Sequence, residues 1–238
     1  MIGASDVCAV ALFVVVGNAM RQGTDFEKEL AFYGSYHQDP VNQLIHFIFI
    51  PMIWWSICVW MCYRPVFGVD LQVGGHKITW GTGMFAIYAM YYTSLDFYTG
   101  GITSALLAAM YLHASSAVAK EVAFAAASQG KKGKKAVAGG LASASGQPWW
   151  KIAFVLHAVA WFMQIVPGHK MAEGVKPALM DSLGQAFGVA PMFAVLEGIW
   201  AVGLAQPLKA AVTVLVKENR EEMCRTAVGG ATFPWCTR

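Results

Sequence analysis

Long apolar runs separated by short polar segments cover most of this chain of 238 residues. An uncharged apolar run of about 20 residues can cross the hydrocarbon core of a bilayer as a helix. The pattern predicts membrane-spanning helices over five stretches: residues 44–63, 78–95, 100–119, 152–166 and 183–208. Because only a few residues separate the second stretch from the third, these two are predicted to form a helical hairpin. The predicted fold class is therefore all-α, a multi-pass transmembrane helical bundle of about five spans.

The segments outside these spans divide the chain further. Residues 1–21 hold an apolar run that is short for a span, which favours a retained N-terminal anchor or a short interfacial helix. Residues 22–216 are predicted to form the membrane domain, with a flexible loop rich in Lys, Gly, Ala and Ser inserted at residues 125–148. Residues 217–238 are predicted to form a polar C-terminal tail.

The composition agrees with a membrane protein and excludes several other classes. Hydrophobic residues make up 57% of the chain and charged residues 13%, whereas about a quarter of a soluble chain is charged. No phosphate-binding glycine loop, nucleophile elbow or dinucleotide fingerprint is present, and nothing indicates nucleic-acid binding. The five cysteines lack zinc spacing, and their odd number predicts no disulfide framework. Cys58 and Cys62, one helical turn apart, are interpreted as packing residues.

The distribution of charge and polar residues predicts a topology. With five spans, four of the 17 Lys and Arg residues lie on the side that holds residues 21–43 and 167–182, and thirteen lie on the other. The positive-inside rule places the lysine-rich side in the cytosol or an equivalent compartment. The same parity brings His37, His46 and His169 to one face of the membrane.

Two of these histidines occur in the stretch FYGSYHQDPVNQLIHFIFIP, where a polar segment meets the first predicted span. They either cap and hydrogen-bond the entrance of a helix or bind a metal. Pro40 interrupts helical continuity between His37 and His46, so both can point to one site. His169 and Glu173 are four residues apart and share one face if helical. Histidines with a carboxylate and open positions are typical of non-haem Fe(II) oxygenases.

Several other ionisable residues are candidates for the same site or for helix packing. Asp96 and Asp181 are further carboxylates on the side of the three histidines. His113 and His157 lie inside apolar spans and are interpreted as helix-packing residues. Glu197 lies in the middle of the last predicted span, so it must face the bundle interior, where it either orients a metal ligand or bonds another helix.

Two segments together resemble a known family. YHQDPVNQLIHFIFIP resembles the signature Y-H-x-x-P-x-N-x-x-I-H-x-I-x-x-P of the membrane 2-hydroxy fatty acid dioxygenases. WFMQIVPGHKMAEGVKPALMDSLGQAFGVAPMFAVLE resembles the second block of that family, W-x-x-Q-F-x-G-H-x-x-x-E-x-x-x-P-A-L-x-D followed by A-P-x-F-x-x-x-E. Members of the family are small multi-pass proteins, typically of the endoplasmic reticulum. They use Fe(II) and O2 to shorten a 2-hydroxy fatty acid by one carbon in alpha-oxidation.

The resemblance implies a function and a site for this chain. It implies an Fe(II) cofactor, a 2-hydroxy fatty acid and O2 as substrates, and membrane lipid as the surroundings. The iron ligands implied by the motifs are three histidines: His37, His46 and His169. Glu173 would be a carboxylate ligand or support one, and Asn42 and Gln164 would be polar neighbours in the catalytic site. The acyl tail would lie among the spans.

The chain departs from the family pattern at several points, and these departures favour an alternative. Pro167 is inserted before Gly168 and His169, which could displace His169 from the site. The basic residues that usually follow the Glu173 position are reduced to residues 174–176, of which only the last is basic. The N-terminal apolar segment and the lysine-rich loop are additions to the compact family core. The alternative is a non-catalytic accessory subunit of a large membrane complex, for example in the mitochondrial inner membrane, in which these additions dock other subunits. A lipid carrier without chemistry would keep the cavity but not the metal site.

Overall fold

The structure, a computed structural model, describes residues 6, 7, 9–11, 13, 14, 26–73, 76–129, 147–177, 187–226, 233, 235 and 236. In chain order its elements are α2 (Phe26–Ser35), α3 (Pro40–Cys62), η1 (Val66–Gly68), β1 (Gln72–Val73), β2 (His76–Lys77), α4 (Trp80–Leu95), α5 (Phe97–Gln129), α6 (Trp149–Met163), η2 (Gln164–Glu173), α8 (Ala190–Ala201) and α9 (Gln206–Thr226). The strands pair as one small antiparallel hairpin, and the described part is otherwise helical. The predicted helical fold class is confirmed.

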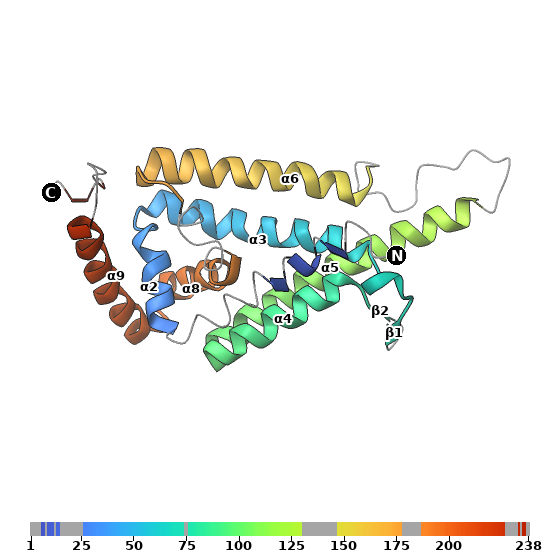
Figure 1. The fold of residues 1–238 in the computed structure, drawn as a ribbon, viewed down its shortest axis with the longest axis horizontal. Helices are drawn as coiled ribbons and strands as arrows, with labels where there is room; N and C mark the ends of the chain where they lie inside the picture. Colours follow the sequence, from blue (N-terminus) through green and yellow to red (C-terminus); the bar gives the residue numbers. More distant parts are fainter. Residues whose placement is uncertain are drawn as a thin grey trace.

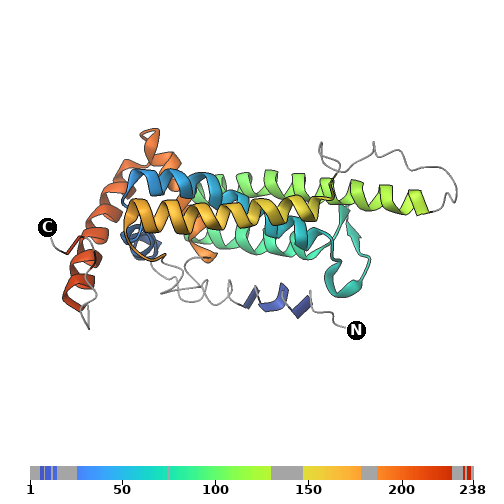
Figure 2. The same cartoon turned by 90° about the horizontal axis from the view of Figure 1, so that it is seen from above.

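Four long helices form the body of the molecule. Helix α3 lies between α6 on one side and the α4–α5 pair on the other (Figure 1). Successive helices run in opposite directions, so α2, the α4–α5 turn and η2 meet at one end of the bundle (Figures 1 and 2). The β hairpin lies at the opposite end.

Local sequence explains how these helices begin. The side chain of Asp39 accepts hydrogen bonds from the backbone N–H groups of Val41 and Asn42, and Pro40 occupies the first turn of α3, where its missing N–H costs nothing. Asp96 accepts hydrogen bonds from the backbone N–H and hydroxyl of Thr99 at the start of α5. These caps fix the turns at the end of the bundle that holds the histidines.

The α4–α5 pair confirms the predicted helical hairpin. The two helices are separated by Asp96 alone and pack along their length. A Cβ atom on Gly100 would collide with the carbonyl group of Tyr92, so this tight connection requires glycine there.

The structure does not confirm the predicted number of about five spans. Among the described residues, three helical stretches are long and apolar enough to cross a membrane: Pro40–Cys62, Phe97–Ala127 and Trp149–Glu173. A fourth span is possible if α8 and α9 are counted together, although the chain bends by 120° between them. Helix α4 has 16 residues, which is short for a span. The N-terminal segment 1–21 falls largely outside the described residues.

The last predicted span, residues 183–208, is not one continuous helix. Helix α8 ends at Ala201, and the chain then turns through Gly203 and Ala205, both with positive φ, before α9 begins. Residues 183–186 lie outside the described part. An apolar composition alone does not reveal such a break, because it says nothing about backbone angles.

Helix α9 corrects the predicted topology of the C-terminal part. It packs against α2 at the end of the bundle that holds η2, rather than at the opposite end (Figures 1 and 2). It carries Lys209, Lys217, Arg220 and Arg225 to that end. Four of the thirteen Lys and Arg residues predicted for the other end therefore lie at the end that holds η2, which weakens the basis of the predicted orientation. The lysine-rich loop is also shorter than predicted, because α5 continues to Gln129; residues 130–146 lie outside the described part.

Candidate metal centre

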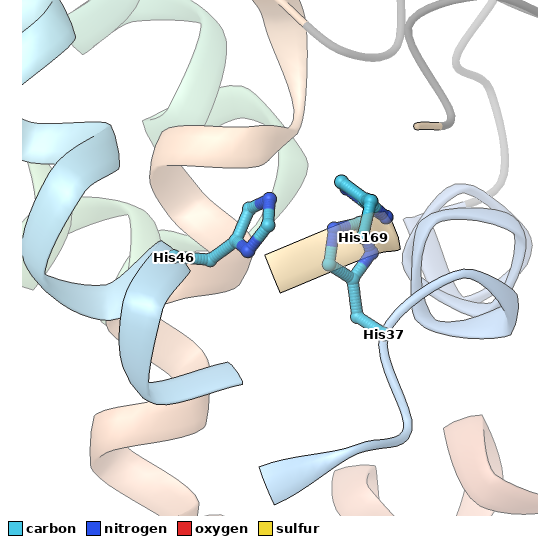
Figure 3. Close-up of side chains that lie close together, drawn as sticks. All are labelled: His37, His46 and His169. Atoms are coloured by element: carbon cyan, nitrogen blue, oxygen red, sulfur yellow. The ribbon is translucent and has the colours of Figure 1, made fainter. Parts of the chain in front are cut away.

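Three separate segments bring three histidines together. His37 follows the end of α2, His46 lies in the second turn of α3, and His169 lies in η2 (Figure 3). Atoms able to bind a metal, one from each residue, all lie within 4.8 Å of one another. Each residue is at most 3% exposed, and neighbouring rings are nearly perpendicular, with centroids 4.4 to 4.8 Å apart. The predicted convergence of the histidines is confirmed.

Hydrogen bonds fix the proton positions of two of these rings. The Nδ1 atom of His37 lies 2.7 Å from the carbonyl oxygen of Tyr33, and that of His46 lies 2.9 Å from the carbonyl oxygen of Asn42. A carbonyl oxygen can only accept, so each Nδ1 carries the hydrogen and each Nε2 keeps a free lone pair. Ring nitrogens of metal-binding histidines are commonly oriented in this way.

Two ring nitrogens at the cluster lack a hydrogen-bond partner. Within the described part of the chain, Nε2 of His37 and Nδ1 of His169 are buried and unpartnered. A buried polar atom without a partner costs free energy, so the gap between the rings suits an ion that would accept these lone pairs.

Burial also keeps His37 neutral. Removal from solvent, followed by the proximity of His46 and His169, lowers the pKa of His37 well below its usual range. A neutral imidazole is the form that binds metals.

Glu173 holds the segment around His37 in place. Its carboxylate accepts hydrogen bonds from the backbone N–H of Gln38 (3.1 and 3.0 Å), the backbone N–H of Asp39 (2.8 Å) and the side-chain amide of Asn42 (3.2 Å). It does not belong to the group of residues that could share a metal. Its hydrogen bonds therefore join η2 to the segment that follows His37 and to the first turn of α3.

Asn42 and Gln164 both lie beside the histidines, as predicted. Asn42 is fully buried, and its side-chain NH2 donates to Glu173 and to the backbone carbonyl group of Tyr36, while its backbone carbonyl group accepts from His46. Gln164 is 6% exposed, and its Nε2 atom has no hydrogen-bond partner among the described residues. Both residues therefore lie beside the histidine cluster, and Gln164 has an unused hydrogen-bond donor.

The inserted Pro167 does not displace His169 from the cluster. The segment η2 is a π-helix, whose turns hold one residue more than those of an α-helix. Such a turn accommodates an inserted residue, and proline lacks the N–H that a regular helix would need there. Gly174, with φ of 74°, then ends η2 by donating its N–H to the carbonyl group of His169.

Two features of the site were missed by sequence reasoning. Arg220 of α9 lies 3.9 Å from Glu173. It places a basic group beside this carboxylate, although the residues that follow Glu173 in the sequence are mostly not basic. Cys224 and Cys236 form a disulfide, which contradicts the prediction drawn from the odd cysteine count. The disulfide holds the tail so that the ring of Trp235 covers the guanidinium group of Arg220 at 3.8 Å. No spacing in the sequence signals either contact.

The other candidate residues do not join the cluster. Asp96 caps α5, and Asp181 lies outside the described residues. His113 accepts a hydrogen bond from Trp55, and His157 bonds Ser56 and Trp161, so both contact a neighbouring helix. His113 is nevertheless exposed, and His157 is half-buried. Cys58 and Cys62 are buried and free, as expected of packing residues. Both carboxyl oxygens of Glu197 are buried without a hydrogen-bond partner in the described part, so neither predicted bond is present.

An apolar cavity opens on the cluster. Its volume is about 70 Å³, so it is narrow. Its polar end is lined by His37, His46, His169 and Gln164. Its remaining walls come mainly from apolar and aromatic side chains: Tyr33, Ile50, Ile53, Trp54, Ile57, Met84, Tyr88, Trp161, Ile165, Pro177, Phe187, Ala190 and Pro191. The cavity thus combines apolar walls with a polar end at the histidines.

Comparisons with known proteins agree with this geometry. A family model described as "2-hydroxy-palmitic acid dioxygenase Mpo1-like" matches residues 23–200. A curated relative, the 2-hydroxy-palmitic acid dioxygenase MPO1 of Saccharomyces cerevisiae, is 25% identical over 188 residues, which are 79% of this chain and 87% of the yeast protein. No solved structure matches the chain. The family match includes the three histidines, Asn42, Gln164 and Glu173, and it ends before α9.

Proposed function

Because this chain belongs to the Mpo1-like family of 2-hydroxy-palmitic acid dioxygenases, we propose that it is a membrane Fe(II)-dependent dioxygenase that shortens 2-hydroxy fatty acids by one carbon. The observation that carries this proposal is the position of three buried histidines at the polar end of a long apolar cavity. The membrane of the endoplasmic reticulum is the compartment that the proposal favours.

The donor set fits iron. Imidazole nitrogens suit iron as well as zinc and copper, and three ligands on one side leave open positions for a substrate and O2. His37 and His46 already present unprotonated Nε2 atoms, so the site needs no change of tautomer to accept an ion. When bound, iron would supply the activation of O2 beside the 2-hydroxy acid.

The protein's own residues would orient the substrate. The unpartnered Nε2 of Gln164 would donate a hydrogen bond to the carboxylate or hydroxyl group of the head. The apolar walls would hold the tail and exclude water from the reacting carbons. Glu173, which lines no part of the cavity, would keep the turn that carries His37 fixed through its hydrogen bonds to Gln38 and Asp39.

The proposed reaction is complete with two substrates. One 2-hydroxy acid and one O2 give the acid shortened by one carbon, one CO2 and one water. The hydroxyl-bearing carbon becomes the new carboxyl carbon, and the bond to the old carboxyl carbon breaks. The four electrons lost by the organic acid are those that O2 takes up, so the site needs no further reductant.

The test is turnover by purified protein loaded with Fe(II) under anaerobic conditions and then given 2-hydroxypalmitate and O2. Oxygen consumption and CO2 release should be equal, and both should vanish in His169→Ala, which removes one histidine of the cluster. The matched control is His76→Ala, because His76 is exposed in the β hairpin and should not affect turnover. Absence of turnover and of retained iron in the unaltered protein would refute the proposal and favour the accessory-subunit alternative.

A further inference from the structure

The cavity is elongated along α3. Five residues of α3 line it at helical spacing, one face of the helix: His46, Ile50, Ile53, Trp54 and Ile57. The path from His46 to Ile57 covers eleven residues, which corresponds to about 16 Å of helix. The lining residues of α6 and η2, from His169 back to Trp161, follow the same direction. A chain that starts at the histidines therefore runs between α3, α4 and α6.

Met84 lies at the far end of this path. It is 1% exposed and, with Tyr88 one turn later, forms the contribution of α4 to the cavity wall. Because α4 runs antiparallel to α3, Met84 is farther from the histidines than Tyr88 and lies at the level of the last α3 residues of the wall.

Just beyond Met84 the backbones of α3 and α4 come into contact. A Cβ atom on Gly81 would lie 2.5 Å from the sulfur of Cys62 and 3.3 Å from the carbonyl oxygen of Cys58. Such an approach leaves no room for an acyl chain between the two helices. The close packing of α3 against α4 therefore lies directly behind Met84, and Met84 is the α4 side chain that a long chain would meet at this end.

We propose that Met84 sets the upper limit of the acyl chain length that the cavity accepts, an inference that rests on the proposed function. A methionine side chain is flexible and adapts to small differences in length, so the limit is gradual. A methylene that no longer fits must stay in contact with water or strain the protein. Each such methylene lowers the affinity by a factor of about four.

The experiment compares chain-length preference in variants of Met84. Metal-free protein is equilibrated with a fluorescent fatty acid, which is then displaced by straight-chain 2-hydroxy fatty acids of increasing length. The Fe(II)-loaded protein is assayed for turnover of the same series. Met84→Trp should shift the preference to shorter chains, with a loss of about fifteenfold for the longest chain against one two carbons shorter. Met84→Ala should shift the preference to longer chains.

Two further variants keep the test decisive. Met90→Trp is the matched control, because Met90 lies on the same helix but is 63% exposed and away from the cavity. Ile57→Trp narrows the same end from α3 and replaces Met84→Trp if that protein does not fold. Unchanged length preference in Met84→Ala and Ile57→Trp would overturn the inference while turnover upholds the proposed function. A length shift in binding without turnover would uphold the inference and refute the proposed chemistry.

Discussion

The assignment of Glu173 as a support rather than a ligand gives the sharpest prediction. In Glu173→Gln the side chain keeps its length, but one acceptor oxygen becomes an NH2 group that faces the donors on Gln38, Asp39 and Asn42. A hydrogen bond to a charged group contributes roughly 1.5–3 kcal/mol, so losing one should destabilise the turn that carries His37 by about 2 kcal/mol. If iron binds only when this turn is ordered, its affinity should fall by about thirtyfold.

The measurement is a competition for Fe(II) between the protein and a chelator, with Co(II) as a spectroscopic substitute. If Glu173 only supports the site, its replacement should weaken metal binding. The absorption spectrum of the bound Co(II) should stay unchanged, because the same three histidines still hold the ion. The matched control is Glu222→Gln, which breaks only an exposed pair with Arg225 and should leave the affinity unaltered. An altered Co(II) spectrum in Glu173→Gln would mean that the carboxylate is itself a ligand, and an unaltered affinity would refute the support role.

Four other perturbations test the remaining parts of the structure. Gly168→Ala should lower iron affinity about tenfold in the same chelator assay, because its Cβ would lie 2.6 Å from Oδ1 of Asn42. Gln164→Ala should keep its iron but lose about tenfold or more in kcat/KM. Cys224→Ser, which opens the disulfide, should lower the free energy of unfolding by about 3 kcal/mol in denaturant titrations. Metal-free protein should lose thermal stability as the pH falls below about 6.5, where the unfolded chain protonates His37 and the folded protein, with its lowered pKa, does not.

The parts of the site that could be predicted from sequence depend on local spacing and on antiparallel helices. Pro40 separates His37 from His46, and a return helix of suitable length brings His169 to the same end. These relations require an even number of helices along the bundle between His46 and His169, which α3, α4, α5 and α6 provide. The insertion of Pro167 does not break this relation, because the π-helical turn accommodates one more residue.

The parts that could not be predicted depend on contacts between distant segments. The run that includes α8 appears continuous by hydropathy, yet the positive φ angles of Gly203 and Ala205 turn the chain and send α9 back against α2. Hydropathy contains no information about this turn. Arg220 contacts Glu173 only because this turn brings α9 back to α2, and the Cys224–Cys236 disulfide lies on the same helix. Neither contact can therefore be predicted without the turn.

The polar residues of the two sequence motifs fall into two groups in the structure, those that line the cavity and those that bond the segments carrying the histidines. Gln164 lines the cavity with the three histidines, whereas Glu173 and Asn42 do not line it and instead bond the segments that carry His37 and His46. The polar residues that hold the histidines therefore lie outside the cavity, while its walls are mostly apolar. This arrangement allows the backbone and Glu173 to fix the ligand geometry without placing a second negative charge beside the carboxylate of a bound acid. Under the proposed function, the carboxylate of Glu173 therefore stays outside the cavity that would hold the anionic head group of the fatty acid.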